Sequence, residues 1–138
     1  MRTPRQILED SITIAVVGAS RDLAKVAHSV PAQMQRHGWR IIPVNPYATE
    51  LFGQSAYPVL GEIPEPVDLV NVFRPAPEAA DVARQAADIG AHAIWLQQGI
   101  VSAEARRIAE AAGIDFVEDY CIAVARAAYA LTRQVDRA

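Results

Sequence analysis

Short apolar runs rich in β-branched residues recur along the chain, and helix-like segments separate them. Residues 12–17 (ITIAVV) form the clearest run, which ends in the small-residue turn Gly18-Ala19-Ser20. Uninterrupted apolar runs of this length are typical of strands buried on both faces of a parallel sheet. The predicted strands are residues 12–17, 40–44, 68–73, 92–96 and 115–118.

The segments between these runs carry helix signals. Apolar residues with a spacing near 3.6 predict a helix over 78–89 that ends before Gly90, and Ser102 is a suitable N-cap for a helix over 103–112. We expect a further helix over 119–131. Pro31 has no N–H to donate, so we place it in the first turn of a helix that begins near residue 28, after an extended loop over 21–27.

This alternation predicts a single α/β domain over residues 1–138 with a Rossmann-like three-layer fold. We expect its five-stranded, mainly parallel sheet in the order 3-2-1-4-5, built from right-handed crossovers. Residues 45–67 are the exception, because their prolines and glycines predict turns around a short strand or helical turn.

Composition argues against several function classes. The chain has a formal net charge of −3 and no run of lysines or arginines, so we expect no nucleic-acid partner. No apolar stretch approaches the roughly 20 residues of a membrane span, and residues 1–10 lack a signal-peptide core, which predicts a cytoplasmic protein without a membrane partner. Cys121 is the single cysteine, and the histidines share no metal-ligand spacing, so we expect no metal.

Residues that follow the predicted strands are the candidates for a binding site, because ligands of open parallel sheets bind beyond the carboxyl ends of the strands. Small residues at 18–20 allow the backbone to approach a ligand closely. Arg21, Lys25 and Arg74 would bring three cations to the same edge, which favours a phosphate-rich ligand. The turn is also compatible with a strand-to-helix connection that binds nothing.

A dinucleotide site has weaker support. Only the first glycine of the G-x-G-x-x-G pattern is present, and Val44-Asn45-Pro46 lacks the acidic residue that accepts from the ribose hydroxyls of NAD. NADP stays open as an alternative, with Arg21 or Lys25 meeting the ribose phosphate. The chain would then be an NADP-dependent oxidoreductase or a redox-sensing regulator.

Four segments in order resemble the blocks of the CoA-binding domain protein family: VVGASRD, IIPVNPYA, AYPVLGEIPEPVDLVNVFR and AIWLQQGIV. The similarity runs from about residue 12 to residue 131. Members of this family are small Rossmann-like nucleotide-binding proteins, similar to the N-terminal CoA-binding domain of the succinyl-CoA synthetase α subunit. The resemblance implies that this chain binds coenzyme A or acyl-CoA without a catalytic residue of its own.

The same resemblance implies which residues surround the cofactor. The first group contacts the phosphates, the second lies by the nucleotide, the third flanks the cofactor, and the fourth occupies the turn after the following strand. In that order the residues are Gly18, Ala19, Ser20, Arg21 and Lys25; Asn45 and Pro46; Val72, Phe73 and Arg74; and Gln97, Gln98 and Gly99.

Two segments depart from the family pattern. Val26-Ala27 stands where Pro-Ser is usual, and Glu118-Asp119-Tyr120-Cys121 replaces the more common M-D-R-C. The missing arginine at 120 removes a cation, unless Tyr120 stacks in its place. Cys121 is either a contact of the CoA thiol or a small apolar filler. No serine elbow or paired carboxylates are present, so we expect no enzyme activity; a homodimer and an acyl-transfer partner protein are the alternatives for a protein partner.

Overall fold

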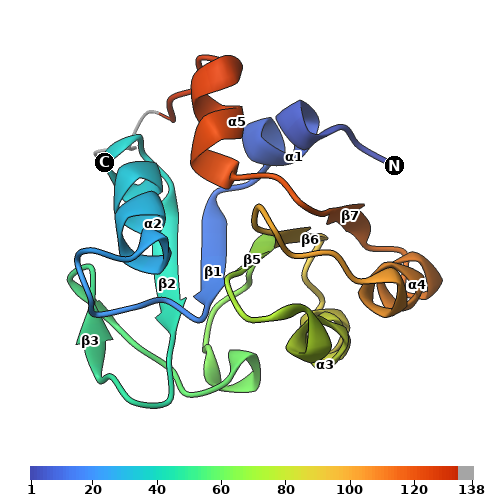
Figure 1. Ribbon diagram of the computed structural model, residues 1–138, viewed down its shortest axis with the longest axis horizontal. Coiled ribbons are helices and arrows are strands. Elements are labelled where there is room, and N and C mark those ends of the chain that lie inside the picture. The colour runs from blue at the N-terminus through green and yellow to red at the C-terminus, as the bar shows by residue number, and fades with distance from the viewer. Residues whose placement is uncertain (134–138) are drawn as a thin grey trace.

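A computed structural model describes residues 1–133, whose main sheet has five strands (Figure 1). Every pair of neighbouring strands is parallel. The strands are β1 (Thr13–Val17), β2 (Arg40–Val44), β5 (Leu69–Val72), β6 (Ala93–Leu96) and β7 (Asp115–Val117). All five predicted strands are therefore confirmed, each within about one residue at either end.

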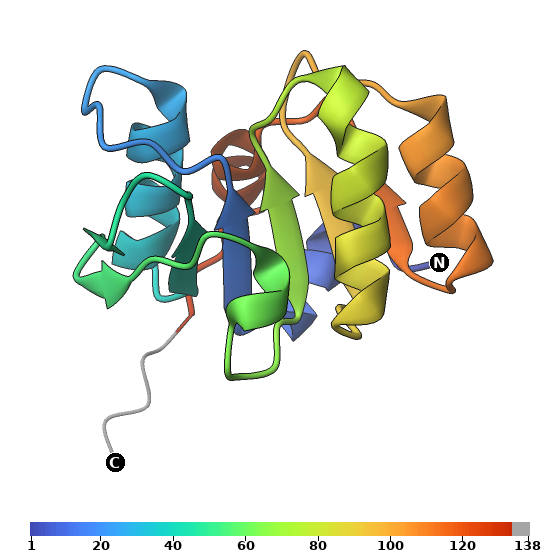
Figure 2. The ribbon, with the colours of Figure 1, turned by 90° about the horizontal axis from the view of Figure 1, so that it is seen from below.

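Helices cover both faces of the sheet and give it three layers (Figure 2). The first face carries α1 (Pro4–Asp10), α2 (Val26–Arg36) and α5 (Ile122–Ala128). The second face carries α3 (Ala76–Asp88), α4 (Ala103–Ala111) and a single 3₁₀ turn, η1 (Leu60–Glu62). The predicted α/β Rossmann-like fold class is confirmed. Among residues 1–133, no helix combines the length and the apolar character that crossing a membrane requires.

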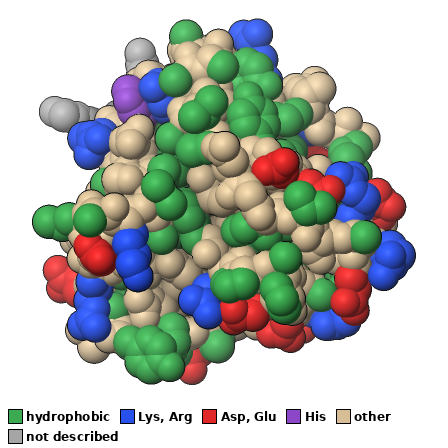
Figure 3. All heavy atoms as spheres, in the orientation of Figure 1, with side chains coloured by type: hydrophobic (Ala, Val, Ile, Leu, Met, Phe, Trp, Pro, Cys, Tyr) green, Lys and Arg blue, Asp and Glu red, His purple; other side chains and the backbone are tan. Residues whose placement is uncertain are grey.

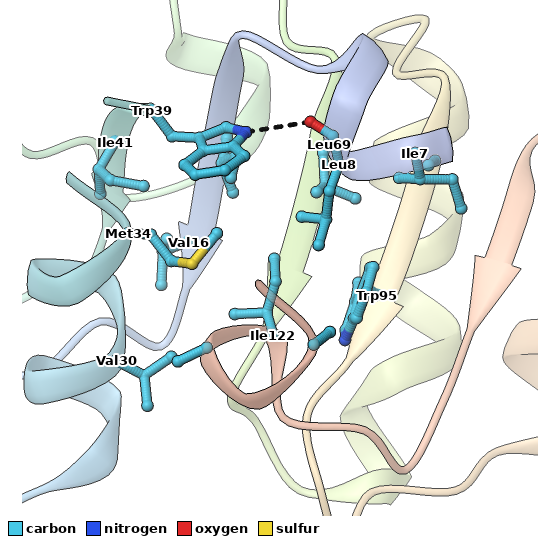
Figure 4. Packing of buried hydrophobic residues seen from close by; sticks show 14 of the residues in the cluster. Ile7, Leu8, Val16, Val30, Met34, Trp39, Ile41, Leu69, Trp95 and Ile122 are labelled. Carbon is cyan, nitrogen blue, oxygen red and sulfur yellow. Dashed lines mark hydrogen bonds between the residues drawn. The ribbon is translucent and has the colours of Figure 1, made fainter. Parts of the chain in front are cut away.

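The core on the first face is built from large side chains (Figure 4). Trp39 and Trp95 are both buried there, and each indole N–H finds a backbone acceptor. Trp39 Nε1 donates to the Leu8 carbonyl at 3.3 Å, and Trp95 Nε1 donates to the Tyr120 carbonyl at 2.7 Å. Because their polar atoms are satisfied, both tryptophans fill core and are not free to bind a ligand.

The strand order differs from the predicted one. Counted in chain order, the sheet runs 2-1-3-4-5, so the expected order 3-2-1-4-5 is wrong. That order needs a third strand outside β2, but the chain there forms only the hairpin of β3 (Glu50–Leu51) and β4 (Gln54–Ser55) and one isolated bridge between Val44 and Tyr57. The chain then crosses to the far side of β1, as in flavodoxin-like sheets. Residues 45–67 contain the turns predicted for them and no helix longer than η1.

The start of α2 also differs from the prediction. The helix begins at Val26, so Pro31 lies in its second turn and not in its first. An interior proline leaves the carbonyl four residues earlier without its helical donor. That carbonyl belongs to Ala27, and it accepts a hydrogen bond from the Ser20 N–H at 3.1 Å. The loop before the helix therefore supplies the donor that Pro31 lacks, which explains why the proline is tolerated.

Helix α1 was not predicted from the sequence. Thr3 caps it, and Thr3 and Gln6 form a capping box in which each side chain bonds the other residue's backbone N–H. Ile7 and Leu8 are buried against the sheet. The helix is short, so its period was not visible in the sequence, but the pattern Thr3-Pro4-x-Gln6 is a helix-start signal that could have identified it.

Candidate functional site

A cleft of about 700 Å³ opens where β1, β2 and β5 end. The arrowheads of β1 and β5 point to the same edge in Figure 2, and the cleft lies at that edge on the side of α3. Residues from four separate parts of the sequence meet there. The predicted site residues that line it are Gly18, Ala19, Ser20, Lys25, Asn45, Pro46, Phe73 and Arg74.

The β1 loop, residues 18–20, is held mainly by its own backbone. Gly18 N–H donates to the Val44 carbonyl and Ser20 N–H to the Ala27 carbonyl, both at 3.1 Å. Two of the N–H groups expected to face a phosphate are therefore used inside the protein. Within residues 1–133 the N–H groups of Ala19 and Arg21 donate to no partner, which leaves them available to a ligand.

Side chains from neighbouring elements fix the same loop. Asn45 Nδ2 donates to the Ala19 carbonyl at 2.8 Å, and Asn45 Oδ1 accepts from the Tyr47 N–H at 2.7 Å. His28 Nδ1 lies 2.7 Å from the Ser20 carbonyl, and because a carbonyl oxygen can only accept, Nδ1 is the donor in this contact. The His28 ring packs on Phe52 of the β3–β4 hairpin, 4.9 Å between centroids. The loop is thus preorganised in one conformation.

The structure brings two of the three predicted cations to the cleft. Lys25 and Arg74 both line it, and Lys25 forms no ion pair within residues 1–133. Arg21 is exposed and does not line the cleft. Arg74 Nε and Nη2 donate to the two carboxylate oxygens of Glu78 at 3.3 and 2.9 Å. The cation cluster is therefore smaller than the sequence suggested, and one of its members is paired.

The predicted residues on β5 and after β6 are mostly used elsewhere. Val72 is fully buried in the core on the α3 face. Gln97 is also buried, and its Oε1 accepts from the Ile122 N–H at 2.9 Å and from Asn71 Nδ2 at 3.3 Å. Gly99 N–H donates to Asp119 Oδ1 at 2.8 Å. Residues 97–99, including exposed Gln98, belong to the loop that connects β6 to α4 and do not line the cleft.

Cys121 and Tyr120 lie on the opposite face of the sheet from the cleft. Cys121 is half-buried at the N-cap of α5, against the core formed with α1 and α2. The Tyr120 ring packs against Trp95 in a tilted arrangement, with 5.7 Å between centroids and 38° between the ring planes. The pKa of the Tyr120 hydroxyl is raised above its ordinary value, mainly by a hydrogen bond with Tyr129 and to a smaller extent by burial. Neither Tyr120 nor Cys121 lines the cleft.

Several residues of the cleft were missed in the sequence. Tyr47 and Val59 come from the turn-rich segment after β2, where no periodic pattern marks a site. Five more share one face of α3, at a spacing of three to four residues that could have been recognised once the helix was predicted. They are Pro77, Glu78, Asp81, Val82 and Gln85.

Charges of both signs line the cleft. Glu78 and Asp81 accompany the two cations, and the face in Figure 3 likewise carries acidic and basic side chains interspersed with apolar ones. Within the described part of the chain, no group of three or more His, Cys, Asp or Glu residues is placed to hold a metal ion.

Comparison with known proteins gives a family match and close relatives. The sequence profile of a family described as a CoA binding domain matches residues 12–127. The uncharacterized protein YneT of Bacillus subtilis is 41% identical over 123 residues, which cover 89% of this chain and 91% of YneT. A solved structure from Thermus thermophilus shares the fold with a TM-score of 0.86 at 37% identity, covering 90% of this chain and 94% of that one.

A larger relative matches through a small part of its length. ADP-forming acetate–CoA ligase I of Archaeoglobus fulgidus is 28% identical over 134 residues, which cover 90% of this chain and 20% of the ligase. The chain thus corresponds to about a fifth of that ligase and to most of YneT.

Proposed function

This chain belongs to the CoA-binding domain family, and on that premise we propose that it binds coenzyme A or acyl-CoA in the cleft at the carboxyl edge of the sheet. One observation carries the proposal: the family match over residues 12–127 includes every residue that lines the cleft. The function proposed is binding alone, without a reaction catalysed by this chain.

Phosphates of the ligand would lie over the β1 loop. The free N–H group of Ala19 and the first turn of α2 offer backbone donors, and the helix dipole favours an anion at the same place. Lys25, the N-cap residue of α2, adds a charge with no competing ion pair in residues 1–133. Charge-assisted contacts of this kind are stronger than neutral hydrogen bonds.

The remainder of the ligand would occupy the space between residues 46–59 and α3. Tyr47 is 83% exposed at the cleft rim and offers an aromatic surface on which the adenine base of CoA can stack. Pro58, Val59 and Val82 provide apolar contacts nearby. A volume of about 700 Å³ lies within the range of sites that hold small organic ligands.

The likeness to the acetate–CoA ligase supports CoA as the ligand and does not extend to ligation. The aligned residues are 20% of the ligase, so its reaction depends on parts to which this chain has no counterpart in the alignment. We therefore infer that this chain binds a ligand of the CoA class, and we propose no ligase activity for it.

Isothermal titration at low salt with CoA, acetyl-CoA and NADP tests the proposal. Wild-type protein is expected to bind CoA with a micromolar Kd. Lys25→Ala removes a cation from the cleft and should weaken CoA binding by about tenfold, the loss expected for one charge-assisted contact. Arg21→Ala is the matched control, because it removes the same charge from the same loop outside the cleft.

Two results would contradict the proposed function. The first is micromolar NADP binding with no CoA binding, which would favour the dinucleotide alternative. The second is an equal loss of CoA affinity in both variants, which would place the ligand outside the cleft.

A further inference from the structure

The Arg74–Glu78 ion pair lies in the wall of the cleft. Both residues line the cleft, and both side chains are 49% exposed. Solvent screens an ion pair of this kind, so it contributes little to the stability of the fold. Its position at a predicted anion site therefore calls for an explanation in terms of ligand binding.

The geometry restricts what the Arg74 guanidinium can do. Its aliphatic part packs against Gly18, which fixes the stem of the side chain beside the β1 loop. Its head presents Nε and Nη2 to Glu78 in a two-point contact. The same two-donor edge is one that arginine uses for bidentate phosphate binding. Glu78 thus occupies donors that a ligand phosphate in the cleft would need.

We propose that Glu78 is an internal competitor for Arg74, and that a phosphate-bearing ligand binds by displacing the Glu78 carboxylate from the guanidinium. This inference rests on the proposed function and adds a determinant of its affinity and charge selectivity. Phosphate dianions and polyphosphates displace the carboxylate more readily than monoanions, because they carry more charge at the same edge. Glu78 therefore lowers the affinity of the cleft for every anion, and it lowers the affinity least for the ligands that carry the most negative charge.

Titration of Glu78→Gln with CoA tests the competition. The amide keeps the size of the side chain and removes its charge, so CoA affinity is expected to rise roughly three- to fivefold, the range of one solvent-screened charge interaction. In an Arg74→Met background the same substitution is expected to change affinity by less than about 1.5-fold, because no guanidinium remains to compete for. Glu104→Gln is the matched control, since it breaks the similarly exposed Arg84–Glu104 pair away from the cleft.

An unchanged or weaker CoA affinity in Glu78→Gln overturns the competition. So does a gain that persists in the Arg74→Met background, because that result means a general charge effect. If wild-type protein binds no CoA, the proposed function fails while the competition is still decided with pyrophosphate as the probe. The Arg74 Nε–H resonance should shift on pyrophosphate addition and shift at lower concentration in Glu78→Gln; no shift in either protein overturns it.

Discussion

The aliphatic part of Arg74 lies directly against Gly18, so close that a Cβ atom at residue 18 would be 2.8 Å from Arg74 Cδ. Gly18 also has a φ of +89°, in the region that L residues rarely adopt. The contact joins the ends of β1 and β5 and holds the Arg74 side chain at the cleft. Glycine is therefore favoured at residue 18 by its backbone conformation, and a Cβ there would also displace the Arg74 side chain.

Gly18→Ala tests both requirements together. We expect the strained backbone and the displaced Arg74 stem to destabilise the protein by about 1–3 kcal/mol and to weaken CoA binding. Gly90→Ala separates the two causes, because Gly90 has a φ of +74° but, its own chain neighbours apart, no atom of residues 1–133 within 4 Å of its Cβ position. The control should lose stability and keep its CoA affinity, as measured by urea unfolding and titration; a matching loss of affinity in Gly90→Ala would contradict the role assigned to Arg74.

Pro31→Ala should affect ligand binding and stability in opposite directions. An alanine N–H at residue 31 would compete with Ser20 for the Ala27 carbonyl and loosen the β1 loop. We expect faster hydrogen exchange at the Ser20 amide and weaker CoA binding, while removal of an interior proline favours the helix by at most about 3 kcal/mol. Exposed Pro66 lies outside the helices, so Pro66→Ala is the control. An unchanged rate of hydrogen exchange at the Ser20 amide would show that its hydrogen bond to the Ala27 carbonyl does not depend on Pro31.

Gln97→Leu distinguishes a structural role from a binding role. Leucine leaves the buried Ile122 N–H and Asn71 Nδ2 without this acceptor, which should cost about 1–3 kcal/mol of unfolding free energy. CoA affinity should stay unchanged, because Gln97 does not line the cleft. The neighbouring Gln98 is exposed, so Gln98→Leu should alter stability by less than about 0.5 kcal/mol. Loss of CoA affinity in a folded Gln97→Leu protein would restore Gln97 to the site.

The Arg40–Glu65 pair should make stability depend on pH in the acid range. Arg40 donates to the Glu65 carboxylate, with Nη2 2.8 Å from Oε2, and this hydrogen bond holds the pKa of Glu65 below its ordinary value of 4.5. Its contribution is therefore present above pH 4.5 and is lost as the pH falls through the lowered pKa of the folded protein. Both side chains are partly exposed, so the contribution is less than about 1 kcal/mol. Urea unfolding at pH 6 and pH 3 should show a smaller acid-induced loss in Glu65→Gln than in wild type.

Local patterns in the sequence were enough to predict the strands and most helices. Arg40–Val44 matches its predicted strand at both ends, and Ser102 caps α4 as expected, accepting from the Ala105 N–H. These features depend on residues close together in the chain. The strand order could not be predicted in the same way, because it depends on which side of β1 the chain returns to after residues 45–67. No short-range sequence pattern predicts on which side of β1 the next strand will lie.

Only some of the predicted site residues line the cleft, and the reason is again that tertiary contacts are not visible in local sequence patterns. The rule that ligands bind at strand ends led to residues at the edge of the sheet where the cleft lies, but it does not tell which way a side chain points. Arg21 and Lys25 are four residues apart in one loop, and only Lys25 lines the cleft. Gln97 follows a strand end, yet its amide is used to hold the start of α5. Such differences depend on tertiary contacts that a single sequence does not display.

The connection from β2 to β5 contains the β3–β4 hairpin and η1 and no full helix, which bears on the size of the cleft. Each crossover in a packed parallel sheet normally places a full helix over one face of the sheet. In the connection that follows β2, the only helical element on that face is the single turn η1. Pro58 and Val59, just before η1, line the cleft beside this single turn. Lengthening residues 45–67 into a helix would therefore close the cleft without altering the sheet, while shortening them would widen it, so changes in this one connection can retune ligand size independently of the core.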